Sequence, residues 1–203
     1  MATLQQIKIR IAREIGRPEA VAEVSEAVAS AILHYERKRF WFNETKTAVA
    51  TVASQENYSL PDNFLSMDQV QFISNNTQWR LEPMPYEWFA ERDHTNPIKG
   101  QSSYWTVYQD RLFLWPVPDV ATYQVVMNYI KKLTAITDGQ SNEFSVELER
   151  LIRYRAKAYL AMDVLHDANL AQIYKAEETE ALRQAESETN RRGTFGRIMA
   201  VYL

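Results

Sequence analysis

The stretch YWTVYQDRLFLW, residues 104–115, decides the middle of the fold. Two runs rich in aromatic, β-branched and leucine side chains, Tyr104–Tyr108 and Arg111–Trp115, flank the polar pair Gln109-Asp110. Strand-forming residues on both sides of a two-residue break predict an antiparallel β-hairpin. The pair is not the Asn-Gly or Asp-Gly that most favours a tight turn, so the flanking runs carry the prediction.

Further segments of similar composition surround this hairpin and are separated by Pro, Asn, Asp and Gly. In chain order they read TAVATV, YSL, MDQVQFI, TQWRLEPM and YQVVMNYI. Short strands with frequent turn signals indicate an all-β domain, sandwich or barrel-like, over residues 46–132. Within it, one short helix is expected from Tyr86 to Asp93.

The segment before the first strand has the 3.6-residue hydrophobic period of helices. A first helix is expected over Leu4–Ile15 and ends at Gly16. Pro18 suits the first turn of a second helix, which should run to about Arg39. We therefore assign residues 1–45 to the N-terminal helices of a bundle.

The helical period returns after a polar break and continues almost to the end of the chain. Asn142 is a suitable N-cap for a third helix, and Asp167 or Asn169 restarts a last, highly charged one. Residues 133–191 thus form the C-terminal helices of the bundle. Residues 192–203 include two glycines and show no period, so they are predicted to be a mobile tail.

Together these patterns predict an α+β fold, with a helical bundle from both chain ends, an inserted all-β domain and a flexible C-terminal tail. The 203 residues carry 23 Lys plus Arg and 26 Asp plus Glu, a net charge of −3, so no strong field draws the protein to nucleic acid or an acidic membrane. No run approaches the ~20 apolar residues of a membrane span. Lys8, Arg10 and Arg13 stand where a signal peptide has its apolar stretch, and we expect no secretion by that route.

Composition also excludes several chemistries. Cysteine is absent, which removes disulfides, thiolate nucleophiles and zinc sites built on Cys. The five glycines form no phosphate-cradling motif. His34, His94 and His166 are far apart in sequence and none has a second His at helical spacing, so we expect no metal and no cofactor. His166 beside Asp167 could be a proton-transfer pair, but neighbours in sequence do not face each other on a helix.

One acidic cluster is a candidate catalytic centre. Glu87, Glu91, Asp93 and His94 lie close in sequence, and a glycosidase needs two carboxylates. The alternative is a solvated face of one short helix, since Glu87 and Glu91 are four residues apart. A cell-wall polysaccharide hydrolase with Glu87 and Glu91 as its carboxylates is therefore kept as a second function.

Four short motifs, which follow one another between the helical segments, are similar to those of a known protein family. They are FWFNE at 40–44, YSLPDNF at 58–64, GQSSYW at 100–105 and DRLFLWPVPD at 110–119. In this order the chain resembles the head-to-tail adaptor (connector) proteins of short-tailed phages. The resemblance covers nearly the whole chain, and its most specific parts are the Tyr-x-Leu-Pro-Asp strand end and the Leu-x-Leu-x-Pro-x-Pro hairpin exit.

The resemblance implies a non-enzymatic virion protein of the neck, assembled in the host cytoplasm. Such adaptors form a dodecameric ring under the portal protein and extend the channel through which double-stranded DNA passes without sequence-specific contact. They offer the tail nozzle or tail tube a docking surface, and no membrane is involved. A tail-completion protein of a long-tailed phage is a further alternative.

In that family the C-terminal segment attaches to the portal. On this chain the implied portal-binding residues are arginines and large apolar side chains. They are Arg191, Arg192, Phe195, Arg197, Ile198, Met199, Val201, Tyr202 and Leu203.

Ring formation suggests a use for the charged C-terminal helices, because a head-to-tail ring joins two different, complementary surfaces. One hypothesis places Glu177, Glu180 and Arg183 of one copy against Arg150, Arg153 and Lys157 of the next. The alternative is that these charges pair within one chain on a solvated face. The free protein is expected to be a monomer, since no long apolar seam demands a partner.

Overall fold

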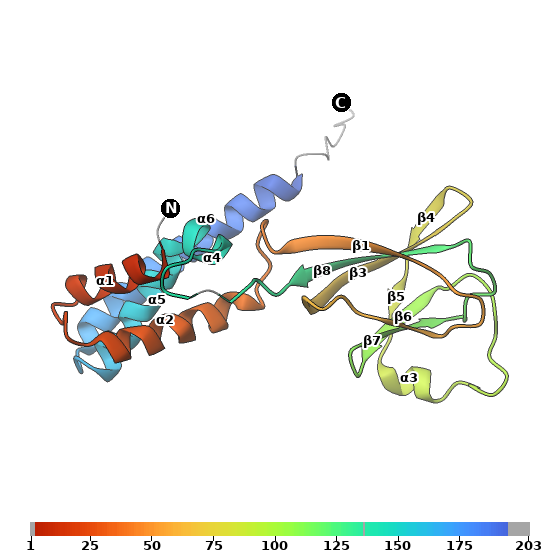
Figure 1. Cartoon of the computed structure of the whole chain (residues 1–203), viewed down its shortest axis with the longest axis horizontal. Coiled ribbons are helices and arrows are strands. Elements are labelled where there is room, and N and C mark those ends of the chain that lie inside the picture. The colour runs from red at the N-terminus through yellow and green to blue at the C-terminus, as the bar shows by residue number, and fades with distance from the viewer. Residues whose placement is uncertain (1–2, 136, 195–203) are drawn as a thin grey trace, which may run out of the picture. The chain divides into compact units, whose positions relative to one another are not determined.

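The computed structural model describes residues 3–135 and 137–194. Figure 1 shows helices formed by both ends of the chain and strands formed by its middle. The chain divides into two compact units: residues 1–43 with 133–203, the helical unit, and residues 44–132, the β unit. The predicted α+β class is confirmed: six helices and two four-stranded sheets make up the described residues.

Helix α1 (Leu4–Glu14) opens the helical unit with a capping box. The Thr3 hydroxyl accepts the Gln6 amide, and the Gln6 side chain accepts the Thr3 amide, which satisfies two free donors of the first turn. The helix ends at Ile15, and Gly16 follows with φ +71°, a left-handed conformation that a glycine adopts at little cost. The predicted end of this helix is confirmed.

Helix α2 (Val21–Glu36) starts later than predicted. Pro18 lies in a turn before the helix. The amide of Arg17, the residue before it, still bonds to the Ala12 carbonyl of α1, so α2 begins only after this turn. The helix also ends before Arg39, at Glu36.

The predicted third helix is two helices, α4 (Glu143–Glu147) and α5 (Glu149–Asp163). Asn142 caps α4 as predicted, and its side chain accepts the Ser145 amide at 3.1 Å. Leu148 breaks the run with φ −115° and ψ 21°, outside the helical region. The buried side chain of Leu148 holds this bend in the core.

Helix α6 (Ala168–Thr194) follows a turn in which His166 has φ +52°. Asp167 accepts the Leu170 amide at 2.9 Å, so its carboxylate caps the helix instead of pairing with His166. The helix continues through Gly193 to Thr194, so the predicted end of the helices at residue 191 falls short of the observed one. Residues 195–203 of the predicted tail lie outside the described residues.

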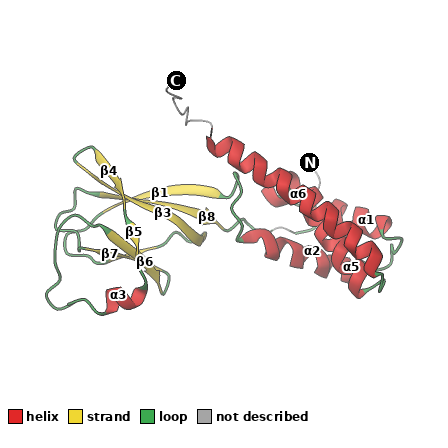
Figure 2. Cartoon of the chain, turned by 180° about the vertical axis from the view of Figure 1, so that it is seen from behind, coloured by secondary structure: helices red, strands yellow, loops and turns green. Residues whose placement is uncertain are grey.

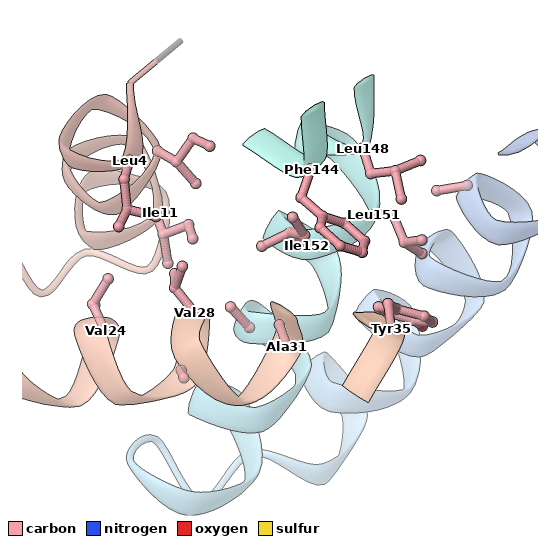
Figure 3. Packing of buried hydrophobic residues seen from close by; sticks show 14 of the residues in the cluster. Leu4, Ile11, Val24, Val28, Ala31, Tyr35, Phe144, Leu148, Leu151 and Ile152 are labelled. Carbon is pink, nitrogen blue, oxygen red and sulfur yellow. The ribbon is translucent and has the colours of Figure 1, made fainter. Parts of the chain in front are cut away.

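The core of the helical unit lies where α1, α2, α4, α5 and α6 meet. Phe40, Phe144, Ile7, Ile11, Leu151 and Ile152 are its largest fully buried side chains. In Figure 3, side chains of α1 and α2 point toward those of α4 and α5, with Ile152 between them. These residues come from both ends of the sequence, so the unit is assembled only when the two ends of the chain meet.

The β unit contains two four-stranded sheets with the orders β1-β8-β3-β4 and β2-β7-β6-β5. The first comprises β1 (Glu44–Ala50), β3 (Phe64–Ser74), β4 (Thr77–Arg80) and β8 (Gln124–Lys131), all antiparallel. The second comprises β2 (Asn57–Ser59), β5 (Glu82–Pro83), β6 (Tyr104–Tyr108) and β7 (Arg111–Trp115). The predicted hairpin is β6–β7, and Gln109 and Asp110 both have positive φ, 47° and 57°.

The two sheets share one apolar core. Val70, Phe72, Val125 and Met127 from the first sheet pack in a cluster with Leu112 and others from the second. Helix α3 (Tyr86–Ala90) covers a smaller cluster with Phe89, Trp115 and Val117, and Figure 2 shows it as a short helix at the edge of the β unit, on the side of β6 and β7. In residues 3–135 and 137–194, no helix is long and apolar enough to span a membrane.

Candidate assembly interface

Helices α5 and α6 share a charged face, at which the sequence predicted contacts between subunits. The Arg150 guanidinium bonds to Glu177 at 3.0 Å and to Gln184 at 3.1 Å, all within one chain. Further along α6, Arg183 pairs with Glu180 at 3.0 Å. The hydrogen bond to Glu177 raises the pKa of Arg150, and the Arg183 guanidinium lowers the pKa of the Glu180 carboxyl.

These four of the six suggested interface residues therefore pair within their own chain on this face, and the other two, Arg153 and Lys157, pair with Glu14. The ion pairs on this face are exposed, and such pairs contribute roughly 0–1 kcal/mol to stability. Pairs of this kind belong to the alternative weighed from the sequence, a solvated helical face, and contacts between subunits at these residues stay a prediction.

Arg153 and Lys157 face the other way, toward α1. Lys157 Nζ lies 2.9 Å from Glu14 Oε2, and Arg153 Nη1 lies 3.3 Å from Glu14 Oε1. The Lys157 ammonium also stands 4.5 Å and 4.4 Å from the ring centroids of Tyr154 and Tyr174. The Lys157 side chain is only 7% exposed, which leaves little of it for a neighbouring subunit to contact. Its charge is neutralised inside the helical unit.

The described part of the suggested portal-binding set sits at the end of α6. Arg191 and Arg192 both pair with Glu188, at 2.8 Å and 2.6 Å, and these arginines lower the pKa of the Glu188 carboxyl. The Arg192 guanidinium also stacks over the Trp41 ring, 4.6 Å from its centroid. The remaining members of that set, Phe195, Arg197, Ile198, Met199, Val201, Tyr202 and Leu203, lie outside the described residues.

Beside Trp41 lies a hollow of about 200 Å³ between α5 and α6. Ala181 and Ala185 leave room in it, and Leu148 and Leu151 form its apolar floor. Glu188 lies at its edge, near the C-terminal end of α6.

A larger groove, of about 590 Å³, lies between α1 and the start of α2. Ile9 and Val21 line it, with 50% and 63% of their surface exposed, and Arg13 stands at its edge. This groove was not predicted from the sequence. The feature of the sequence that could have indicated this groove is Ile9, an apolar residue outside the hydrophobic stripe of α1.

The acidic cluster of the β unit lies on a short helix and the loop after it. Glu87 and Glu91 are both exposed, on the single turn of α3 and at its C-cap. Asp93 accepts the amides of Thr95 and Asn96, and His94 lies 3.0 Å from Glu56 and 3.1 Å from the Phe89 carbonyl. Two of the four residues thus hold a loop, and the two carboxylates face solvent without the enclosure that a glycosidase acid needs.

The three histidines are dispersed in the structure as in the sequence. His34 lies on α2 near Arg155, His94 is in the β unit, and His166 is in the turn before α6. Among residues 3–135 and 137–194, no three His, Asp or Glu side chains form a group that could hold a metal ion.

Similarity to a known family extends over nearly the whole chain. The sequence model of a family described as SU10 adaptor protein matches residues 2–199. No curated protein matches the sequence.

Proposed function

Because the chain belongs to the SU10 adaptor protein family, a family of structural phage adaptors, we propose that it forms a ring that joins the portal to the tail and extends the DNA channel. As a phage adaptor it is a virion component that contacts other parts of the particle. The family match over residues 2–199 carries this proposal. The proposed ring is a dodecamer in the virion neck, assembled in the host cytoplasm.

We propose that portal attachment is made by the segment after α6. Helix α6 has 27 residues and, at about 1.5 Å per residue, is about 40 Å long, so it presents residues 195–203 at the end of a rigid rod. Most of those residues are large and apolar: Phe195, Ile198, Met199, Val201, Tyr202 and Leu203. Burying one such side chain against a partner contributes about 1.5–3 kcal/mol, so several together can supply much of the affinity for a portal.

The contacts at the base of this segment support the same role. The pairs of Arg191 and Arg192 with Glu188 lie within α6, whereas the Arg192 guanidinium stacks on Trp41 and so ties the last turn of α6 to another part of the helical unit. A fixed exit lowers the entropy that the segment loses when it binds. The proposed portal contacts therefore belong to residues after Thr194, with Arg192 as a positioning residue through Trp41.

The channel that the proposed ring extends must let DNA slide. A net charge of −3 per chain is compatible with that demand, because many phosphate contacts would make DNA binding strong and dependent on salt. The other suggested docking partner, a tail nozzle or tail-tube protein, would meet the ring on a separate surface.

The test mixes the purified protein with the portal oligomer of the same phage and examines the mixture by light scattering and electron microscopy. We expect a ring on the portal, and loss of that ring when the chain is truncated after Thr194, because α6 stays complete in this variant. A control replaces Lys46, an exposed residue of the β unit, with Gln, which removes one charge and keeps the segment. Binding to a tail tube but not to the portal would favour a tail-completion protein instead, and binding to neither would contradict the proposal.

A further inference from the structure

We propose that neighbouring copies in the ring meet through two surfaces on different flanks of α2: the groove between α1 and α2 of one copy receives the exposed face of α2 and α5 of the next. This inference rests on the proposed function, since it concerns the ring contact itself. It replaces the α5–α6 charges, whose partners lie within the chain. A ring of identical subunits needs two different complementary surfaces, and these two satisfy that requirement.

The first surface, the α1–α2 groove, is apolar with a cationic edge. Ile9 and Val21 are 50% and 63% exposed in a hollow of about 590 Å³. Lys8 and Asp138, which also line it, neutralise each other in an ion pair at 2.6 Å. Arg13 stands at the edge, and none of the ion pairs within residues 3–135 and 137–194 includes it. The groove thus offers apolar surface and an unneutralised guanidinium to a partner.

The second surface, the α2–α5 face, is apolar with an acidic edge. Leu33, Tyr159 and Met162 are 70%, 41% and 50% exposed. Tyr159 and Met162 flank a hollow of about 250 Å³ whose other wall is formed by small residues of α2, and Leu33 follows these residues on the same helix. The small residues are Ala27, Ser30 and Ala31. Ala27 and Ala31 are buried, so Ser30 is the small residue of this wall that a neighbouring copy can contact.

Two carboxylates give this face its charge. The Tyr159 hydroxyl donates to Asp163, and this hydrogen bond is the main reason why the pKa of Tyr159 is raised. The Glu26 carboxylate is close enough to raise the pKa of Tyr159 further. Within the described part of the chain, neither Glu26 nor Asp163 belongs to an ion pair. Two cations also line the hollow, but Arg155 is held by Glu178 at 3.2 Å, which leaves Lys175. Two carboxylates against one ammonium keep the edge negative, and the guanidinium of the α1–α2 groove complements it.

The two surfaces are separate, so each copy can use both at once. Val21, Val24 and Ser25 of α2 line the groove, whereas the α2 residues of the other hollow come later on the helix. Exposed Tyr, Met and Leu side chains gain most when a partner excludes water from them. Opposite charges at the edges set the orientation of the pair and exclude contact of like surfaces. A second copy of this chain is thus the occupant that matches each surface in both polarity and charge.

Charge reversals test the contact. Arg13→Glu alone and Glu26→Arg alone should each reduce ring formation on the portal about tenfold or more, because every contact in the ring then sets like charges together. An equimolar mixture of the two variants should assemble again. Where the variants alternate around the ring, the carboxylate introduced at position 13 meets the guanidinium introduced at position 26, and the unchanged Arg13 and Glu26 meet at every other contact. The double variant in one chain should also assemble.

Lys46→Glu, a charge reversal on an exposed strand position of the β unit, is the control for net charge, and circular dichroism checks that each variant is folded. Arg183→Glu tests the α5–α6 surface and should leave the ring intact.

If both single variants form rings as the unmodified chain does, the inference is overturned and the proposed function stands. If folded single variants fail and their mixture fails too, the pairing of these two surfaces is overturned. If the unmodified chain forms no ring on the portal, the proposed function is overturned as well.

Discussion

Tyr35 on α2 donates its phenolic hydroxyl to the carboxylate of Glu178 on α6, and both side chains are buried in the helical unit. Arg155 of α5 approaches the same carboxylate at 3.2 Å, so three helices meet at one buried charge. Tyr35 and Glu178 are 143 positions apart in sequence, and their bond joins the two ends of the chain. We therefore expect this hydrogen bond to contribute to the stability of the helical unit.

Removal of the Tyr35 hydroxyl should weaken the helical unit. Tyr35→Phe keeps the ring in place and leaves Glu178 with Arg155 alone, so the variant is expected to lose about 1–3 kcal/mol of unfolding free energy. Urea unfolding measures the loss. Tyr174→Phe, which removes the hydroxyl of a half-buried tyrosine on α6, is the control, and an equal loss in both variants would contradict a special role of the Tyr35–Glu178 bond.

The same bond predicts a dependence on alkaline pH. Burial, with the Glu178 hydrogen bond and charge, raises the pKa of Tyr35 above its unfolded value of about 10. A raised folded pKa means that this stabilisation is complete below about pH 10 and is lost as the pH rises further. Stability curves above that pH should fall more steeply for the unmodified chain than for Tyr35→Phe, and parallel curves would count against the prediction.

The pair Lys157–Glu14 should respond unequally to loss of either partner. Glu14→Gln leaves the buried Lys157 ammonium without a carboxylate and is expected to cost about 3–5 kcal/mol. Lys157→Met removes the buried charge, and Glu14 keeps Arg153 at 3.3 Å, so the cost should be smaller. Chemical denaturation of both variants compares them, and a larger loss for Lys157→Met would refute this interpretation of the pair.

The two cores should be separable by mutation. Ile152→Ala in the helical unit is expected to cost about 2–5 kcal/mol and Phe72→Ala in the β unit about 3–5 kcal/mol, since both side chains are fully buried. Amide hydrogen exchange should show faster exchange in α1, α2 and α5 for the first variant and in the strands for the second. Uniform loss of protection in either variant would show that the units do not respond separately.

The β6–β7 turn offers a stabilising change. Gln109 and Asp110 have φ of 47° and 57°, which suits a type I′ turn but strains these side chains. Gln109→Asn with Asp110→Gly supplies the preferred residues and is expected to raise the unfolding free energy by about 0.5–1 kcal/mol. Thermal unfolding checks it, with Gln172→Asn at an exposed position of α6 as the control, and a lower melting temperature would mean that the native turn is not strained.

The sequence alone determined the elements and their class. The 3.6-residue period located the helices near both ends, the strand-forming runs located the hairpin β6–β7, and Asn142 marked the cap of α4. These features are local, because the period and the caps depend on residues within about one turn of each other. The predicted boundaries differ from the observed ones at Pro18, Leu148 and Gly193. At Leu148 the reason is packing, because this side chain is buried in the core of the helical unit.

The tertiary structure alone decided which charges and apolar faces remain available to partners. From the sequence, Arg150, Lys157 and Glu177 were equally good candidates for contacts between subunits, because helical spacing shows only which residues share a face. Packing of α5 against α1 buried Lys157 on Glu14, and packing against α6 paired Arg150 with Glu177. The same packing left Arg13, Glu26 and the apolar residues beside them available, since pairing depends on which helices meet in space and not on their order along the chain.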